Sequence, residues 1–292
     1  TEVIPLGSPE YRETLRQQRF LNGEDGTSIP EHIKIAREGD AIRSLGALIG
    51  NGINQLTPWA RVLERIDQSL DRWEQSRPTM EGRRLIISMI VGGMTQYLTK
   101  VQGMPKEIEH RLEKRIRNFL WDNKTHVRVN KETIYAPIEK GGRNLLDLLA
   151  RNEAIMITWL QGYLDLSENR ATWAYVADAL IAQNLPSKFA NIEERSRINM
   201  FLQSWNACTS KLPKDLKDMI HVARKYGARL EGRAFSREIL REMPAWHHKE
   251  APQTSSMYNN KQSRCLRGNH DVTTVGDLER EANKIRTIRH CR

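Results

Sequence analysis

Apolar residues recur every three or four positions from residue 57 to residue 121, the spacing that places them on one face of an α-helix. Thr57 and Pro58 supply an N-cap hydroxyl and a proline suited to a first helical turn, and Pro78 ends the first helix. The expected apolar positions are Trp59, Leu63, Ile66, Leu70 and Trp73, then Leu85, Ile86, Met89, Ile90, Met94, Tyr97 and Leu98, then Ile108, Leu112, Ile116, Phe119 and Leu120. The pattern predicts three amphipathic helices, the second of them buried on most of its circumference.

A pair of glycines interrupts the second helix. Gly92 and Gly93 each cost about 1 kcal/mol relative to alanine inside a helix, so we expect a kink or a close helix contact there. Short strands are expected before residue 52, where the β-branched runs 32–36 and 41–50 flank a Gly-Asp turn. These runs predict a β-hairpin near the N-terminus.

Helical patterns continue through the second half of the chain. They cover residues 144–164, 171–184, 193–207, 214–227 and 275–290, whereas 134–138 is expected to be extended and 244–262 has the composition of a linker. We therefore expect a mainly α protein, a helical bundle followed by a helical connector, with a short β-hairpin near the N-terminus. Its expected segments are 1–51, 52–132, 133–243 and 244–292.

The formal net charge of +10 favours a polyanionic partner, since basic surfaces bind phosphates with release of counterions. Residues 100–131 hold nine Lys or Arg against four Asp or Glu, and the basic residues of the third helix lie away from its apolar stripe, where they are placed to face a partner. These residues are Arg111, Lys114, Arg115 and Arg117. Solubility alone also explains a basic charge, and Phe119 and Trp121 are expected in the core.

No catalytic constellation can be assembled from the sequence. It contains no phosphate-binding GxxxxGK[ST] loop, no GxSxG nucleophile turn and no HExxH zinc motif. A four-ligand zinc set is conceivable near the end of the chain, and the adjacent imidazoles of His247 and His248 are a second possibility. The ligands of the four-ligand zinc set would be Cys265, His270, His290 and Cys291. Their spacing fits no zinc template, which favours unrelated side chains and no metal site.

The three cysteines lie far apart, which implies no disulfide framework and favours a reducing compartment. No apolar run is long enough to span a bilayer, so we expect no membrane association and an intracellular protein, nuclear or cytoplasmic. The chain starts with TEVIPLG and no initiator Met, and we expect it to be a piece of a longer protein.

An ordered set of motifs follows the helical pattern. It consists of Trp73, Gly82-Arg83, Tyr97, Pro105, Phe119-Leu120-Trp121, Pro137, Gly141-Gly142 and Asp147. In this order the motifs resemble the region after the polymerase palm in LINE-type (non-LTR) retrotransposon reverse transcriptases, in the style of elements from mushroom-forming fungi. Thr1-Glu2 resembles the end of palm motif D, and Arg43-Ser44-Leu45-Gly46 resembles the hairpin that grips the primer. Residues past about 165 match no motif of that family.

The resemblance implies a non-catalytic C-terminal fragment of an RNA-directed DNA polymerase. Residues 1–51 would be a palm remnant with the primer-grip hairpin, 52–132 a thumb, 133–243 a helical connector, and 244–292 a linker and basic C-terminal helix. The catalytic aspartates, which would hold Mg²⁺ in the intact polymerase, are missing, so we expect no bound cofactor and no activity of the chain alone. The implied partners are RNA and DNA, as a template–primer duplex, and the upstream palm and fingers.

The candidate nucleic-acid-binding residues are Arg43, Arg83, Arg84, Lys100, Arg111, Lys114, Arg115 and Arg117, and the primer-grip residues are Leu45 and Gly46. Two alternatives stay open. One is a helical protein–protein interaction scaffold whose positive charge is incidental, with a partner on exposed apolar surface in the second half. The other is a stand-alone metal-dependent enzyme, which would need a metal near Cys265 or His247-His248.

Overall fold

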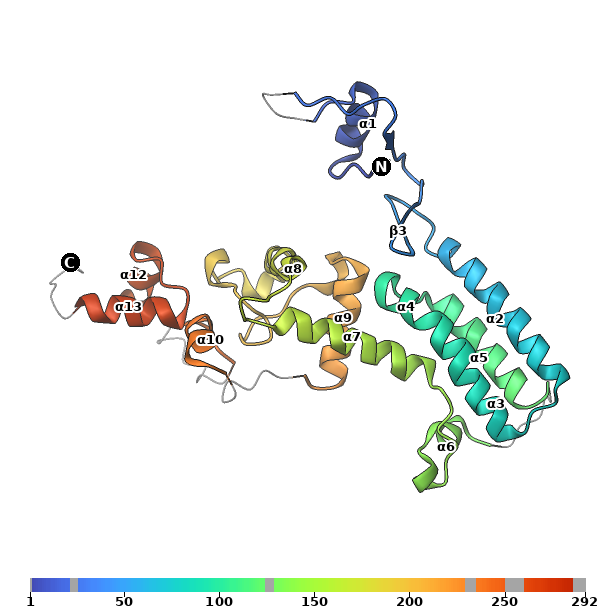
Figure 1. Ribbon diagram of the computed structural model, residues 1–292. Coiled ribbons are helices and arrows are strands. Elements are labelled where there is room, and N and C mark those ends of the chain that lie inside the picture. Colours follow the sequence, from blue (N-terminus) through green and yellow to red (C-terminus); the bar gives the residue numbers. More distant parts are fainter. Residues whose placement is uncertain (1, 22–25, 124–128, 229–234, 250–259, 286–292) are drawn as a thin grey trace. The chain divides into compact units, whose positions relative to one another are not determined.

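The computed structural model describes residues 2–21, 26–123, 129–228, 235–249 and 260–285. The protein is mainly helical with a small antiparallel hairpin near its N-terminus, which confirms the expected fold class. Contacts divide the chain into two compact units, residues 1–152 (unit 1) and residues 153–292 (unit 2), so the segment limit expected at residue 132 falls inside unit 1. Figure 1 shows the elements in chain order.

A small apolar cluster holds the first part of unit 1 together. Helix α1 (Pro9–Gln18) begins at Ser8, whose hydroxyl caps the first turn, and it buries Leu15 in this cluster. Strand β1 (Glu2–Val3) pairs in parallel with β2 (Lys34–Ile35) beside the helix.

The hairpin consists of β3 (Ile42–Ser44) and β4 (Ala47–Ile49), joined by Leu45 and Gly46. Both turn residues have positive φ, 49° and 91°, the conformation that a tight two-residue hairpin turn needs. The pairing predicted across the Gly-Asp turn is wrong, because β2 pairs with β1 and the whole hairpin lies within the second β-branched run.

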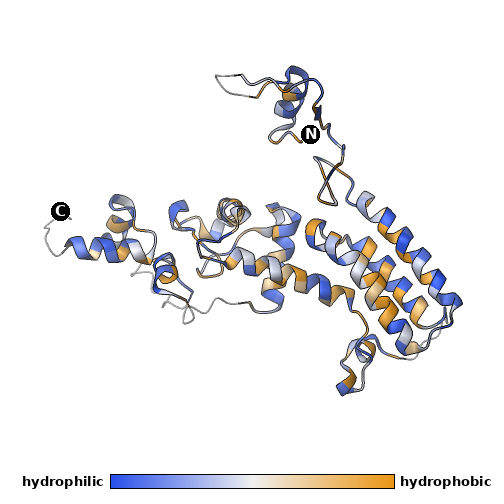
Figure 2. Ribbon diagram, in the orientation of Figure 1, coloured by the Kyte–Doolittle hydropathy of each residue, from blue (hydrophilic) through white to orange (hydrophobic). Residues whose placement is uncertain are grey.

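The long helices of unit 1 are α2 (Thr57–Gln75), α3 (Met80–Ile87), α4 (Gly93–Gln102) and α5 (Lys106–Leu120), with the π-helix η1 (Ser88–Gly92) between α3 and α4. Figure 2 shows hydrophobic and hydrophilic stretches alternating along them. Their buried side chains form one core, as the apolar spacing predicts. This core includes Trp59, Leu63, Ile66, Leu70, Ile86, Ile87, Ile90, Val91, Leu98, Ile108, Leu112, Ile116, Phe119 and Leu120.

The second of the predicted helices is buried on one side only, so the prediction that most of its circumference is buried is wrong. Its outer side exposes Leu85, Met89, Met94, Tyr97 and Val101. An apolar stripe on the exposed side of a helix has the same sequence spacing as one on the buried side. Only the packing of neighbouring elements distinguishes the two.

At the glycine pair, where a kink or a close helix contact is predicted, the structure has the π-helix η1, which ends at Gly92. Its wider turn leaves backbone acceptors without regular helical partners. Arg151, in the first turn of α7 (Leu148–Leu164), donates to the Gly92 carbonyl at 3.3 Å and to Thr95 Oγ1 at 2.7 Å. Burial lowers the pKa of Arg151, and the charge of Glu109 opposes that effect.

A tight reversal follows α5. The prediction that 134–138 is extended is wrong, because helix α6 (Lys131–Tyr135) occupies part of this segment. The 3₁₀ helix η2 (Ile138–Lys140) then leads to Gly142. A Cβ at Gly142 would lie 1.9 Å from the Ala136 carbonyl oxygen, so only glycine fits there. The Leu145 N–H then donates to the Ile134 carbonyl at 3.1 Å and closes the reversal.

Unit 2 packs the part of α7 that follows residue 152 with α8 (Thr172–Gln183) and α9 (Lys214–Lys225), and short 3₁₀ helices lie between α8 and α9. The helix predicted over 193–207 is wrong, because only Glu194–Ser196 forms a 3₁₀ turn there. The buried amide of Gln203 replaces helical hydrogen bonds in this segment. It accepts from the N–H groups of Ile198 and Asn199 and donates to the carbonyls of Ser196 and Trp246.

The last part of unit 2 contains α10 (Arg237–Arg241), α12 (Lys261–Asn269) and α13 (Val275–Ile285). Within the predicted linker, Trp246 is buried and donates its indole N–H to the Val272 carbonyl at 2.7 Å. This part of the segment is therefore packed, while 250–259 lies outside the described residues. Within the described chain, no helix combines the length and the apolar character needed to cross a membrane.

Candidate nucleic-acid interface

One arginine of α5 forms ion pairs with three acidic residues of α2. Arg115 contacts Asp67, Asp71 and Glu74 at 3.3, 2.5 and 2.9 Å, and Arg111 contacts the same Asp67 at 3.1 Å. The three carboxylates are spaced by four and three residues, which aligns them on the side of α2 that faces α5. Arg115 is only 18% exposed, so its guanidinium belongs to the packing of unit 1, whereas Arg111 is 59% exposed.

This arrangement leaves other cations on the outer sides of both helices. Lys114 and Arg117 of α5 are exposed and form no ion pair with any residue that the structure describes. Three arginines of α2 share that condition, namely Arg61, Arg65 and Arg72. Three acidic residues of α2, Asp67, Asp71 and Glu74, contact Arg115 instead of these arginines. Their spacing opposite a basic helix was the signal that could have revealed this contact from the sequence.

Besides Arg115, two more of the arginines predicted to bind nucleic acid are held by the protein. Arg83 is 8% exposed and donates to the carbonyls of Pro78 and Phe119, at 3.1 and 2.8 Å, and to Asp122 at 2.9 Å. It therefore binds the C-terminal end of α5 and is not accessible to a partner. Arg84 pairs with Glu81, and its side chain is 15% exposed.

The hairpin presents an exposed turn and is fixed to α4. The Tyr97 hydroxyl donates to the Leu45 carbonyl, and the Gln102 amide accepts the Leu48 N–H at 3.0 Å. Leu45 is 94% exposed in a left-handed conformation, which is costly for leucine and gains no packing within the described residues. A Cβ at Gly46 would lie 3.3 Å from the Tyr97 ring, so glycine suits this close approach. Arg43 and Lys100 are also exposed.

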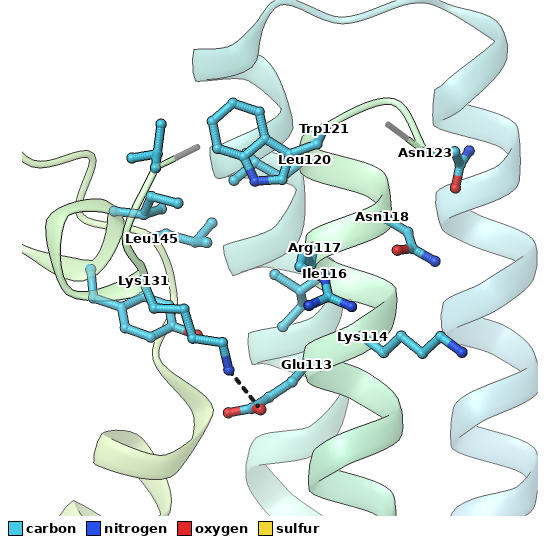
Figure 3. Close-up of a pocket in the computed structure, with 13 residues that line it drawn as sticks. Glu113, Lys114, Ile116, Arg117, Asn118, Leu120, Trp121, Asn123, Lys131 and Leu145 are labelled. Carbon is cyan, nitrogen blue, oxygen red and sulfur yellow. Dashed lines mark hydrogen bonds and ion pairs between the residues drawn. The ribbon is translucent and has the colours of Figure 1, made fainter. Parts of the chain in front are cut away.

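A pocket of about 470 Å³ opens beside the basic side of α5 (Figure 3). Its lining comes from α5, α6 and the segments next to them, namely Glu113, Lys114, Ile116, Arg117, Asn118, Leu120, Trp121, Asn123, Val129, Lys131, Ile134, Tyr135 and Leu145. We call it the Trp121 pocket. Lys131 contacts Glu113 at 3.3 Å, and Figure 3 shows Trp121 and Lys131 on one side, Lys114 and Asn118 on the other, and Arg117 between them.

No group of three or more potential metal ligands occurs among the described residues. Of the candidate zinc set, His290 and Cys291 lie outside those residues. His270 contacts Glu281 at 3.3 Å, and Cys265 accepts a hydrogen bond from Asn269 at 3.4 Å. Burial lowers the pKa of His247, and the nearby Arg267 charge lowers it further.

Comparison with known proteins adds no relative. The chain matches no known protein family, and no curated protein matches it. The resemblance to LINE-type reverse transcriptases therefore stays a prediction from the sequence.

Proposed function

We propose that unit 1 binds the phosphate backbone of a nucleic-acid duplex through the outer sides of α2 and α5. The observation that carries this proposal is a set of exposed cations that form no ion pair within the described parts of the chain, while Arg115 contacts the acidic side of α2. These cations are Arg61, Arg65, Arg72, Lys114 and Arg117. Flexible cationic side chains on rigid helices contact phosphates with little dependence on base sequence. Arg111 is exposed enough to contribute as well.

Within the same proposal, the chain is the thumb and primer-grip part of a LINE-type reverse transcriptase. The duplex would then be an RNA–DNA template–primer, and catalysis would need the palm with its Mg²⁺-binding aspartates. The hairpin supports this assignment, because Tyr97 and Gln102 fix an exposed turn at Leu45 and Gly46. The coding sequence upstream of Thr1 tests it: metal-binding aspartates of a polymerase palm would support the assignment, and unrelated sequence would contradict it.

The binding experiment measures the affinity of the full chain for a blunt RNA–DNA hybrid by fluorescence anisotropy over a series of KCl concentrations. We expect affinity to fall as salt rises, with little dependence on base sequence. The double variant Lys114→Glu/Arg117→Glu removes two phosphate contacts, so the slope of log K against log salt should fall by about 2.

The matched control is Lys217→Glu/Arg224→Glu, which makes the same change of charge at exposed positions of α9. We expect this control to keep the slope of the parent chain. Arg115 is not a suitable target, since its loss would disturb the packing of α2 on α5. An affinity that is unaffected by salt and equal in both double variants would reject the proposal.

A second candidate is the helical protein–protein scaffold. The exposed apolar stripe of α3, η1 and α4, which includes Leu85, Met89 and Val101, favours it, because exposed apolar patches often mark protein contacts. Tyr175 and Val176 of α8 expose further apolar surface in unit 2. This function predicts no affinity for the hybrid duplex at any salt concentration, so the same anisotropy series separates the two candidates.

A further inference from the structure

We propose that the Trp121 pocket binds a nucleotide, with its base against Trp121 and its phosphate near Arg117 and Lys114. The inference rests on the proposed function, because it names a second nucleic-acid element that the same unit would take, an unpaired nucleotide in addition to the duplex backbone.

The size and floor of the pocket suit a small flat ligand. Its volume of about 470 Å³ lies within the range of ordinary small-molecule sites, about 300–1,000 Å³. Ile116, Leu120 and Leu145 line it and are at the same time buried members of the unit 1 core. Since the core fixes these side chains, the apolar floor is preformed.

Aromatic side chains supply the surface that a base would use. Trp121 follows directly after α5 and is half-buried, packed against the core while it lines the pocket. Tyr135 lines the same pocket, and burial raises its pKa to about 12, with the charges of Glu113 and Asp147 acting in the same direction. Its hydroxyl therefore stays protonated at neutral pH and can donate a hydrogen bond to a base edge.

The charges of the pocket favour an anion at the other end of the ligand. Glu113 offsets the charge of Lys131, with which it forms an ion pair at 3.3 Å. Arg117 and Lys114 have no such partner among the described residues, and they extend from the middle of the pocket to the side opposite Trp121 (Figure 3). A simple anion would leave the aromatic surface unused, and an uncharged aromatic ligand would leave these cations uncompensated. A base joined to a phosphate uses both.

Two sources could supply this chemistry, an unpaired nucleotide at the end of a strand or a free nucleotide. The experiment compares a blunt RNA–DNA hybrid with the same hybrid carrying a single-stranded overhang, and it titrates AMP and adenosine separately. Because a base gains affinity by stacking on an aromatic side chain, we expect the overhang to tighten binding roughly tenfold if a strand end is the ligand. Saturable binding of AMP, tighter than that of adenosine, would identify a free nucleotide.

Trp121→Leu keeps apolar volume and removes the stacking surface. We expect it to abolish the overhang preference or the AMP binding while the affinity for the blunt hybrid stays within about twofold, a change under 0.5 kcal/mol. Arg117→Gln is the second variant, and it should weaken AMP more than adenosine without disturbing the core, since its side chain is exposed. Circular dichroism of both variants verifies that they are folded.

The outcomes separate this inference from the proposed function. If the chain binds the blunt hybrid but shows neither an overhang preference nor AMP binding, the pocket assignment is overturned and duplex binding stands. If AMP binds in a Trp121-dependent manner and the blunt hybrid does not bind, the pocket assignment stands and duplex binding fails. Nucleotide binding that is unchanged in Trp121→Leu and Arg117→Gln also overturns the assignment.

Discussion

Replacing Arg115 by methionine is expected to loosen α2 from α5. The substitution keeps most of the apolar stem and removes the guanidinium that contacts Asp67, Asp71 and Glu74. An exposed ion pair contributes about 0.2–1 kcal/mol, and hydrogen bonds to charged groups with limited solvent access contribute more, about 1.5–3 kcal/mol. The three carboxylates are 37%, 65% and 27% exposed, so only the contact with Glu74 approaches the higher range.

Together, the lost contacts lower the free energy of unfolding by about 2 kcal/mol. Part of this value is the mutual repulsion of the three carboxylates once the guanidinium is removed. Hydrogen–deuterium exchange with peptide resolution measures the protection of backbone amides in α2 and α5 separately from those of unit 2. A loss of 2 kcal/mol lowers protection of globally exchanging amides about 30-fold, since 1.4 kcal/mol corresponds to a factor of ten.

Arg117→Met is the matched control, because it removes the same group from an exposed position two residues further along α5. Exposed substitutions of this kind usually change stability by less than about 0.5 kcal/mol. If Arg115→Met and Arg117→Met exchange alike in α2 and α5, Arg115 does not hold the two helices together and the reasoning is refuted.

Three further predictions concern other parts of the molecule. Gly142→Ala places a Cβ 1.9 Å from a backbone carbonyl oxygen, which should lower the free energy of unfolding by about 2 kcal/mol. We therefore expect the melting temperature of unit 1 to fall by several degrees, and an unchanged melting temperature would contradict this. Tyr97→Phe removes the hydroxyl that holds the Leu45 carbonyl, so hairpin amides should exchange several-fold faster while those of α2 do not change. Partial burial tends to raise the pKa of Asp277, but N–H and hydroxyl donors of the preceding threonines outweigh it and hold the pKa at about 2. Because this pKa lies below the usual 3.8, the ionised carboxylate stabilises unit 2 above about pH 4, and this stabilisation is lost as the pH falls toward 2. In Asp277→Asn, acid unfolding should therefore lack the loss of stability that the parent chain shows between about pH 4 and pH 2.

The helical spacing was sufficient to predict the three-helix core of unit 1. It depends on local periodicity, and positions such as Ile66 and Ile116 are buried where the pattern places them. The irregular segment around Gln203 was beyond such reasoning. Its hydrogen bonds reach the Trp246 carbonyl, 43 residues further along the chain, and no local pattern records a partner at that distance.

The candidate interface was predictable in part. Its location on α5 follows from basic residues away from the apolar stripe, but the sequence could not distinguish Arg115, which the protein binds, from Arg117, which it leaves exposed. That distinction depends on which side of α2 faces α5. Arg83 was beyond prediction for a related reason, since it reaches the end of a helix 36 residues further along.

The contacts around Gln203 also set an order of events during synthesis. Besides the bond from Gln203 to the Trp246 carbonyl, the Ser204 N–H donates to the His247 carbonyl at 2.7 Å and the Lys249 N–H donates to the Leu202 carbonyl at 2.8 Å. A ribosome that has translated only as far as α9 has not yet supplied these partners. Backbone groups of the buried segment therefore stay solvated until residues 246–249 emerge, and unit 2 cannot complete its fold before that point.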